Sequence, residues 1–318
     1  MTAPLSTIWR PVEPYDLALT IGSLRRGGSD PSTVPHDGAW WHAFRTPAGP
    51  VTLRVHQSRE GIHAHAWGPG SQEALAGVPR MLGGDDDWSG FDHPTVLATL
   101  PEHVRLARQR HPGLRLLRTG RVLEVLIPAI LEQKVTGKEA FAGYRRLVAL
   151  FGEAAPGLSE PGGYPPAQFP PGLRLGPEPQ TWARIPSWAW HQAGVGPQRS
   201  DTIMRALQRA SALGRLGQVD APTASRALQS ISGIGRWTAA EVTQISHGDP
   251  DSVSVGDYHL AGFVGLALIG EPVDDAGMLE LLEPWRGNRQ RVVRLLGLTG
   301  IRKERHGPRM SVRDYRRF

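Results

Sequence analysis

The hydrophobic pattern of this 318-residue chain changes its period once, near residue 94. Between residues 38 and 67, apolar and polar side chains alternate in the runs AWWHAFRT, VTLRVHQS and GIHAHAWG, which is the spacing of half-buried strands. Beyond residue 94, apolar residues recur at helical spacing instead. A parallel β-α-β sheet requires strands and helices to alternate along the chain, whereas here the strands precede a long run of helices. We therefore expect an α+β fold with a small antiparallel sheet at its amino-terminal end.

The same change sets the expected domain boundaries. Residues 1–92 would form the antiparallel α/β domain, residues 93–300 an all-helical region, and residues 301–318 a basic tail. Within the first domain we expect helices near 14–27 and 71–83, the second of them capped by Ser71. Within the helical region, helices are expected at 95–110, 121–135, 138–151, 200–213, 223–231, 237–246, 258–269, 276–283 and 288–297.

A proline- and glycine-rich insertion interrupts the helical region. The stretch 152–179 holds eight prolines and six glycines. Proline removes a backbone donor and disrupts a helix interior. We therefore expect this insertion to run over the surface as a long connection.

Composition excludes several classes of protein. The chain has no cysteine, which excludes disulfides, thiolate nucleophiles, Cys-ligated zinc and Cys-ligated iron–sulfur clusters. The longest apolar run, at 260–270, is about half of a bilayer span. The first twenty residues lack a basic start followed by an apolar stretch. We therefore expect no membrane partner and a cytoplasmic location.

The basic residues are almost all arginine. Of 36 basic residues only Lys134, Lys138 and Lys303 are lysine, and the formal net charge is +6. Arginine suits bidentate recognition of phosphate, as in nucleic acid. A codon bias in a GC-rich genome explains the same ratio equally well. In either case, the chain offers few amines for chemistry.

The most informative segment lies at 224–260, where two helical patterns flank a tight turn. The turn is Ser232-Gly233-Ile234-Gly235, and the whole hairpin spans 230–237. The two glycines allow positive φ, and Ile234 would enter the core. The free N–H groups at the start of the second helix form a cradle for a phosphate oxygen. A G-x-G turn between helices is also common without any ligand, so the turn alone leaves both interpretations open.

The surrounding residues strengthen the first interpretation. LQSISGIGRWTAAEV followed by SVSVGDYHL resembles the hairpin-plus-aspartate signature of the helix–hairpin–helix DNA glycosylase superfamily, most closely bacterial 3-methyladenine DNA glycosylase II. Asp257 follows Gly235 by 22 positions, in agreement with that family. PYDLAL at 14–19 and HPGLRLLRTGRVLEVLIPAILEQKVTGKEA at 111–140 are also similar to family segments.

The resemblance implies an antiparallel α/β domain beside two helical subdomains with a central cleft between them. It also implies base excision repair, in which a monomeric, nucleoid-associated bacterial enzyme flips a damaged base out of double-stranded DNA. The enzyme would hydrolyse the N-glycosidic bond of an alkylated purine and leave an abasic site. Two alternatives stay open: a glycosylase for deaminated or oxidised bases, and a catalytically inactive DNA-binding lesion sensor.

Asp257 is the expected catalytic residue. Cleavage of the bond builds positive charge on the deoxyribose, and a nearby carboxylate stabilises that charge and can orient water. Asp257 also precedes a helical pattern, so it is equally suited to cap that helix. The related lyases carry a lysine just after the hairpin, where this chain has Trp237. Since indole cannot form a Schiff base, the resemblance implies a monofunctional enzyme without AP-lyase activity.

The resemblance also assigns further residues to the site. Trp237, Glu241 and Gln133 would line the base pocket; for each, core packing or surface exposure is the alternative. Glu241 stands where the alkylation enzymes usually have an aromatic residue, and Lys134 stands where they have an apolar wedge. The expected DNA contacts are Gly233, Ile234, Gly235, Arg236, Thr238, Lys134 and His259. No cofactor is expected to be required, although the backbone carbonyls of Ile231 and Ile234 would hold a structural Na⁺ or K⁺.

Overall fold

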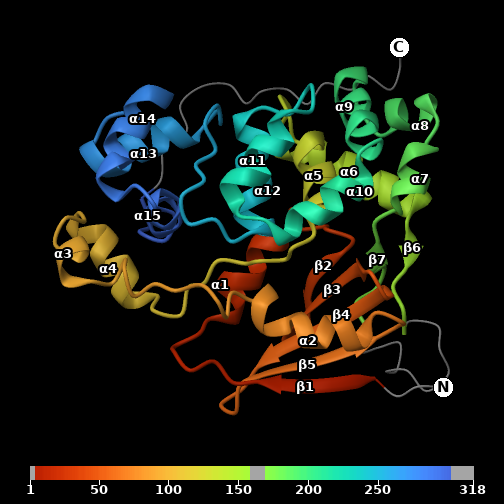
Figure 1. Ribbon diagram of the computed structural model, residues 1–318, viewed down its shortest axis with the longest axis horizontal. Helices are drawn as coiled ribbons and strands as arrows, with labels where there is room; N and C mark the ends of the chain where they lie inside the picture. Colours follow the sequence, from red (N-terminus) through yellow and green to blue (C-terminus); the bar gives the residue numbers. More distant parts are fainter. Residues whose placement is uncertain (1–3, 158–168, 302–318) are drawn as a thin grey trace.

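The computed structural model describes residues 4–157 and 169–301. It is an α+β structure in which one sheet lies beside a larger helical region (Figure 1). No helix in the described parts of the chain is long and apolar enough to cross a membrane. The basic tail predicted at 301–318 lies, apart from its first residue, outside the described residues.

The five-stranded sheet is antiparallel throughout, in the order β1-β5-β4-β3-β2. The three predicted strands are confirmed. β1 and β2 were not predicted, because they are short and lie apart from the alternating region. The strands are β1 (Leu5–Trp9), β2 (Thr33–His36), β3 (Ala39–Thr46), β4 (Gly49–Gln57) and β5 (Ile62–Trp67).

One face of the sheet packs on helices α1 (Leu17–Ile21) and α2 (Ser71–Met81). The first helix is shorter than the predicted 14–27. The predicted cap at Ser71 is wrong: Gly70 occupies the cap position, and the Ser71 hydroxyl donates to the Gly68 carbonyl at 2.6 Å.

The other face of the sheet is covered by the described parts of the proline-rich insertion. Trp41 and Trp67 stack on this face with ring centroids 5.5 Å apart, and Phe169 packs on Trp41 at 4.7 Å. Leu173 and Leu175 complete this core, and β6 (Glu153–Ala154) pairs with β7 (Arg174–Leu175). The expectation of a surface connection is therefore wrong for these residues, because two tryptophans on the sheet need an apolar cover.

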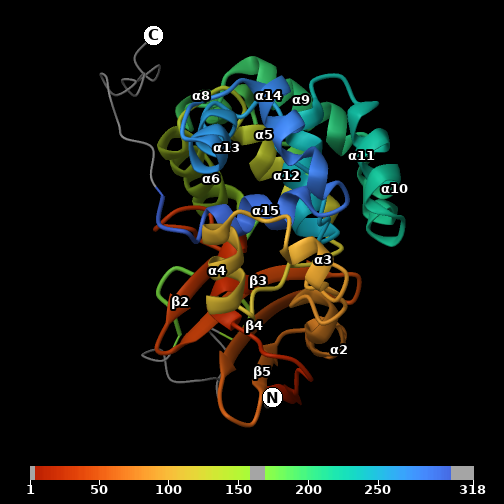
Figure 2. The same ribbon diagram turned by 90° about the vertical axis from the view of Figure 1, so that its left-hand side faces the viewer.

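The helices form two groups, each around its own core (Figures 1 and 2). The central core comprises mainly helices α5 to α12, and the second comprises α3, α4 and α13 to α15. Of these helices, α7 and α8 were not predicted. Their bounds are α3 (Pro94–Leu97), α4 (Glu102–Arg110), α5 (Val122–Leu131), α6 (Gly137–Phe151), α7 (Pro179–Ala183), α8 (Ser187–Gln192), α9 (Pro197–Leu207), α10 (Ala210–Arg215), α11 (Ala221–Gln229), α12 (Arg236–Ser246), α13 (Leu260–Ile269), α14 (Asp275–Leu282) and α15 (Arg289–Leu296).

Candidate functional site

The chain passes from the central core to the second core between α12 and α13. Ile234 and Val242 belong to the central core, whereas Val253 and Ala261 belong to the second. The loop between the two helices carries Ser254 and Asp257. The predicted catalytic residue thus lies where the two groups of helices meet.

The hairpin joins α11 to α12 as the sequence predicted. Ile234 is 5% exposed and enters the central core. Gly233 has φ +95°, and a Cβ there would lie 2.2 Å from the Thr202 Oγ1 atom. Gly235 has φ −99° and open space where a Cβ would be. Only Gly233 therefore needs to be glycine for conformation and packing, contrary to the expectation that both take positive φ.

The start of α12 offers hydrogen-bond donors. The first backbone bond of the helix runs from the Ala239 N–H to the Gly235 carbonyl, so the N–H groups of Arg236, Trp237 and Thr238 precede the helical ladder. Arg236 is exposed, whereas the Thr238 side chain is buried and accepts a bond from Gln133. Thr238 can therefore contact DNA through its backbone but not through its hydroxyl group.

Asp257 is held by three donors. Its Oδ1 atom accepts the backbone N–H groups of His259, at 2.8 Å, and of Leu260, at 2.9 Å. Its Oδ2 atom accepts the indole Nε1–H of Trp237 at 3.3 Å. The carboxylate thus caps the turn before α13 and faces α12 at once, so capping and a role in the site are compatible. The indole donor also places Trp237 at the carboxylate rather than in a core.

Glu241 lies on α12 one turn after Trp237 and contacts the same loop. The Ser254 hydroxyl donates to Glu241 Oε1 at 2.5 Å, and Gln244 Nε2 donates to that hydroxyl at 2.9 Å. The Ser254 carbonyl accepts the Asp257 N–H at 3.2 Å. A single loop residue therefore bonds the Glu241 carboxyl group through its hydroxyl and the Asp257 backbone through its carbonyl.

The surroundings of Glu241 disfavour its charged form. Burial raises the pKa of Glu241 most, and the charges of Glu132 and Asp257 raise it further, while the Ser254 hydrogen bond and the Arg26 charge act in the opposite direction. Arg26 forms an ion pair with Glu132 at the end of α5. The solvent-facing alternative for Glu241 does not fit these contacts.

The residues that follow α5 contact the hairpin. Gln133 Nε2 donates to the Gly233 carbonyl at 3.0 Å and to Thr238 Oγ1 at 2.8 Å. The next residue, Lys134, is exposed and has φ +54°, an uncommon conformation for a residue with a side chain. Gln133 therefore braces the turn with its amide nitrogen, and Lys134 stands at the surface beside it.

The contacts of two further residues named in the predictions, His259 and Ile231, are as follows. The His259 side chain is exposed and lies edge-on to Tyr258, with ring centroids 4.8 Å apart. The Ile231 carbonyl accepts the Ile234 N–H at 3.0 Å, and a carbonyl has a second lone pair for a cation.

Several residues of the site could not be predicted. Arg205 Nε donates to the Ser232 carbonyl at 2.9 Å, which adds a positive charge beside the hairpin. Arg26, Glu132 and Ser254 likewise act on Glu241. Although Ser254 and Glu132 lie within the quoted family segments, nothing in the sequence indicates what these residues contact, because the packing of separate segments brings them together.

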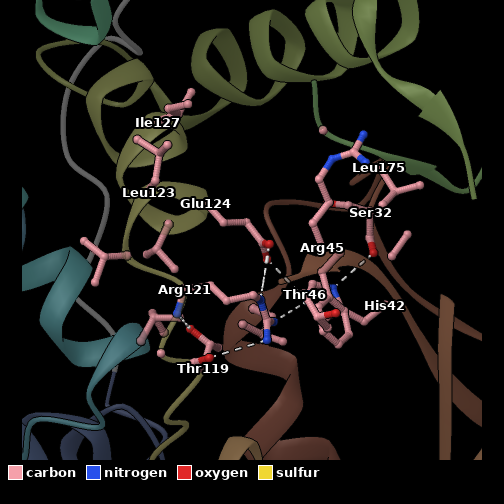
Figure 3. Close-up of a pocket in the computed structure, with 18 of the residues that line it drawn as sticks. Ser32, His42, Arg45, Thr46, Thr119, Arg121, Leu123, Glu124, Ile127 and Leu175 are labelled. Carbon is pink, nitrogen blue, oxygen red and sulfur yellow. Dashed lines mark hydrogen bonds and ion pairs between the residues drawn. The ribbon is translucent and has the colours of Figure 1, made fainter. Parts of the chain in front are cut away.

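A separate cavity of about 630 Å³ lies between the sheet and α5 (Figure 3). Arg121 stacks on Phe44 at 3.9 Å, donates to Glu124 at 3.2 Å and bonds His42 Nε2 at 2.9 Å. Burial disfavours the charge of Glu124, but Arg121 and His42 outweigh it and lower the pKa of Glu124 to about 2. None of the predicted site residues lines this cavity.

Comparison with known proteins gives the fold its context. No protein-family model matches the chain, and no curated protein matches it. A 3-methyladenine DNA glycosylase from Archaeoglobus fulgidus has a similar structure, with TM-score 0.72 and 17% identity over 93% of this chain and 98% of that one. An 8-oxoguanine glycosylase/lyase from Clostridium acetobutylicum gives TM-score 0.69 and 14% identity over 94% and 98% in its apo form. Its complex with double-stranded DNA gives TM-score 0.66 and 14% identity over 93% and 96%.

Proposed function

We propose that this chain, which has the fold of the helix–hairpin–helix DNA glycosylase superfamily, is a DNA N-glycosylase that hydrolyses the bond between a damaged purine and its deoxyribose. The observation that carries the proposal is the geometry of Asp257. Its carboxylate is held by Trp237, His259 and Leu260 beside a hairpin whose helix begins with free N–H groups. The structural neighbours named above are DNA glycosylases, which supports the same reading.

The hairpin would grip one DNA strand without reading its sequence. The N–H groups at the start of α12 point positive partial charge at an anion, and Gly235 leaves open space for the close approach of a phosphate. Arg236, in the first turn of α12, and Lys134, which follows the hairpin-bound Gln133, are both exposed. Binding should therefore weaken steeply with salt.

Asp257 would act on the sugar once the base has been flipped out. As the N-glycosidic bond stretches, positive charge develops at C1′, and a carboxylate about 4 Å away stabilises it by roughly 4 kcal/mol at an effective dielectric near 20. That corresponds to about a thousandfold in rate. The same carboxylate can take a proton from the water that attacks C1′. Two backbone donors and one indole hold it in place for both tasks.

We further propose that the enzyme is monofunctional and accepts alkylated purines. Trp237 occupies the position after the hairpin, and its nitrogen donates to Asp257; it carries no primary amine for a Schiff base with C1′. Its aromatic ring can stack on an electron-poor flipped base. Water is then the nucleophile, and an abasic site is the product.

A structural cation at the hairpin is also part of the proposal. The carbonyls of Ile231 and Ile234 would hold a Na⁺ or K⁺, and the Ile231 carbonyl keeps one lone pair beyond its bond to the Ile234 N–H. When bound, the ion would supply positive charge to a DNA phosphate. Arg205, which donates to the neighbouring Ser232 carbonyl, already supplies part of that charge.

The test is base release from duplexes that each contain one lesion. Incubation with duplexes carrying 7-methylguanine should create abasic sites, seen as strand breaks after alkali but not before it. Borohydride should trap no covalent enzyme–DNA complex. The inactive lesion sensor predicts binding without base release, and breaks before alkali together with a trapped complex would show a lyase.

A further inference from the structure

The two oxygens of Glu241 are in different situations. Oε1 accepts the Ser254 hydroxyl at 2.5 Å. The described residues supply no hydrogen bond to Oε2 of this half-buried carboxyl group. This oxygen is not one of the buried polar atoms that lack a hydrogen-bond partner, so water or a substrate can reach it. Glu241 therefore has one fixed oxygen and one available oxygen.

We propose that Glu241 is a general acid that protonates the departing base, so that the enzyme releases neutral damaged purines as well as bases that already carry positive charge. This inference rests on the proposed function, since it assumes N-glycosidic hydrolysis at Asp257. Under this proposal the enzyme has an additional class of substrate, the neutral damaged purines. These bases leave readily only when a proton neutralises the negative charge that bond cleavage places on them.

The hydrogen bonds around Ser254 determine which oxygen of Glu241 carries the acidic proton. Gln244 Nε2 donates to both the Ser254 hydroxyl oxygen, at 2.9 Å, and the Ser252 carbonyl, at 3.0 Å. Because Gln244 supplies the donor to Ser254, the Ser254 proton is free to point at Glu241 Oε1. The acidic proton of Glu241 then belongs on Oε2, the oxygen that no described residue uses.

Hydrogen bonding divides the roles between the two carboxyl groups. Three donors stabilise a negative charge on Asp257, two of them backbone N–H groups. A single hydroxyl donates to Glu241. A buried carboxyl group with few donors favours the protonated form. Asp257 is thus suited to face the cationic sugar, and Glu241 is suited to carry the proton.

The charges around Glu241 agree with this division. Asp257 faces it from the loop before α13, Glu132 from the end of α5, and Arg26 from the segment before β2. Arg26, the cation that acts on Glu241 within the described part of the chain, is already paired with Glu132. A third negative charge on Glu241 would have no cation of its own, and a proton removes that repulsion.

The reaction balances with these two groups and one water. The C1′–N bond breaks and its electron pair leaves with the base, which takes the proton from Glu241 Oε2. Water adds to C1′ and gives its proton to Asp257. Return of one proton from Asp257 to Glu241 through solvent restores the enzyme, and the net reaction consumes one water. A base that is already cationic, such as 7-methylguanine, leaves without the first proton.

The experiment compares the two classes of base in one assay. Single-turnover excision from duplexes carrying hypoxanthine, a neutral purine, or 7-methylguanine is measured between pH 5 and 9 for the wild type and Glu241→Gln. The amide keeps the shape but has no proton to give. We expect Glu241→Gln to slow hypoxanthine release about a hundredfold more than it slows 7-methylguanine release.

The pH profile supplies a second readout. Hypoxanthine release by the wild type should fall relative to 7-methylguanine release as the pH rises through the pKa of Glu241, and Glu241→Gln should lack this dependence. Ser254 is a positioning residue in this scheme. Because its hydrogen bond lowers the pKa of Glu241, Ser254→Ala should shift the fall to higher pH, a change that a merely structural role would not produce.

Controls separate this inference from the proposed function. Glu280→Gln, a change of an exposed carboxyl on α14, should leave both rates unchanged, and melting temperatures show whether each variant folds. Release of 7-methylguanine without hypoxanthine, or equal slowing of both by Glu241→Gln, overturns the general acid and leaves the glycosylase intact. Release of neither base by the wild type overturns both.

Discussion

Two glutamates of this protein are each influenced by an arginine, and yet their pKa values shift in opposite directions. Glu124, at the start of α5, touches Arg121 and His42, and its pKa falls to about 2. Glu241, on α12, faces two carboxyl groups and an arginine that is paired elsewhere, and its pKa rises. Burial opposes the charge of both, so the balance of neighbouring charges makes the difference.

The difference indicates where stability and function lie. In the cavity between the sheet and α5, the charge of Glu124 is matched by Arg121, which touches it and also bonds His42 on the sheet, and such a network holds two layers together. Around Glu241 and Asp257 the acids outnumber the free cations. Unbalanced groups of this kind are typical of functional sites. Changes in the first region should therefore alter stability, and changes in the second should alter catalysis.

The largest expected effect comes from Asp257→Asn. The neutral amide cannot stabilise the cationic sugar, so base release should fall about a thousandfold, whereas DNA affinity should change little. Rates from single-turnover release and affinities from a gel-shift titration check this. Wild-type release by this variant would contradict the assignment of Asp257, and a similar loss in Glu124→Gln would remove the distinction between the two regions.

The hairpin gives a test that involves no acid. Gly233→Ala forces a left-handed residue with a side chain against Thr202, so we expect a loss of roughly 1–3 kcal/mol in stability together with weaker DNA binding. Gly235→Ala is the matched control, since its Cβ meets open space and its φ suits any residue. Urea unfolding should separate the two, and equal destabilisation by both would show that our account of the turn is wrong.

Glu124→Gln tests whether the charge of Glu124 stabilises the fold. Because the folded protein depresses the pKa of Glu124 to about 2 from 4.5, its charge stabilises the fold above about pH 4.5, and this contribution disappears as the pH falls toward 2. A third of the side chain is exposed, so we expect a loss of only about 1–2 kcal/mol at pH 7. Denaturant unfolding at pH 7 and pH 3 measures the free energy of unfolding of both proteins. The difference between variant and wild type should be smaller at pH 3, and a difference that does not change with pH would refute the charge of Glu124 as its cause.

The smallest expected effect is a gain. Since the folded protein raises the pKa of Glu241, the wild type loses stability as the pH rises above the ordinary carboxyl range. Glu241→Gln lacks this penalty and should melt at a higher temperature than the wild type at neutral pH, with the advantage shrinking toward pH 4. Thermal unfolding across this range measures it, and an equal or lower melting temperature at pH 7 would count against an unfavourable charge at position 241.

The features predicted from the sequence are those that neighbouring residues determine. Alternation over 38–67 placed three strands correctly, because period-two patterning shows in a short window. The short strands β1 and β2 and the helices α7 and α8 have too few residues for such a pattern. The proline-rich insertion was expected to run over the surface because its prolines and glycines exclude a helix, yet Phe169 and Leu173 cover tryptophans that lie over a hundred positions earlier.

The sequence by itself determined the order of sheet and helices, the glycine turn with Ile234 at its centre, and the placing of Asp257 shortly after it. Only the tertiary structure decided which groups meet Glu241, the second carboxyl group of the site. Arg26, Glu132 and Ser254 come from three separate segments and set the charge balance around Glu241. The reason is physical: backbone conformation depends mainly on adjacent residues, whereas the protonation of a buried group depends on every charge and donor that packing brings within a few ångströms.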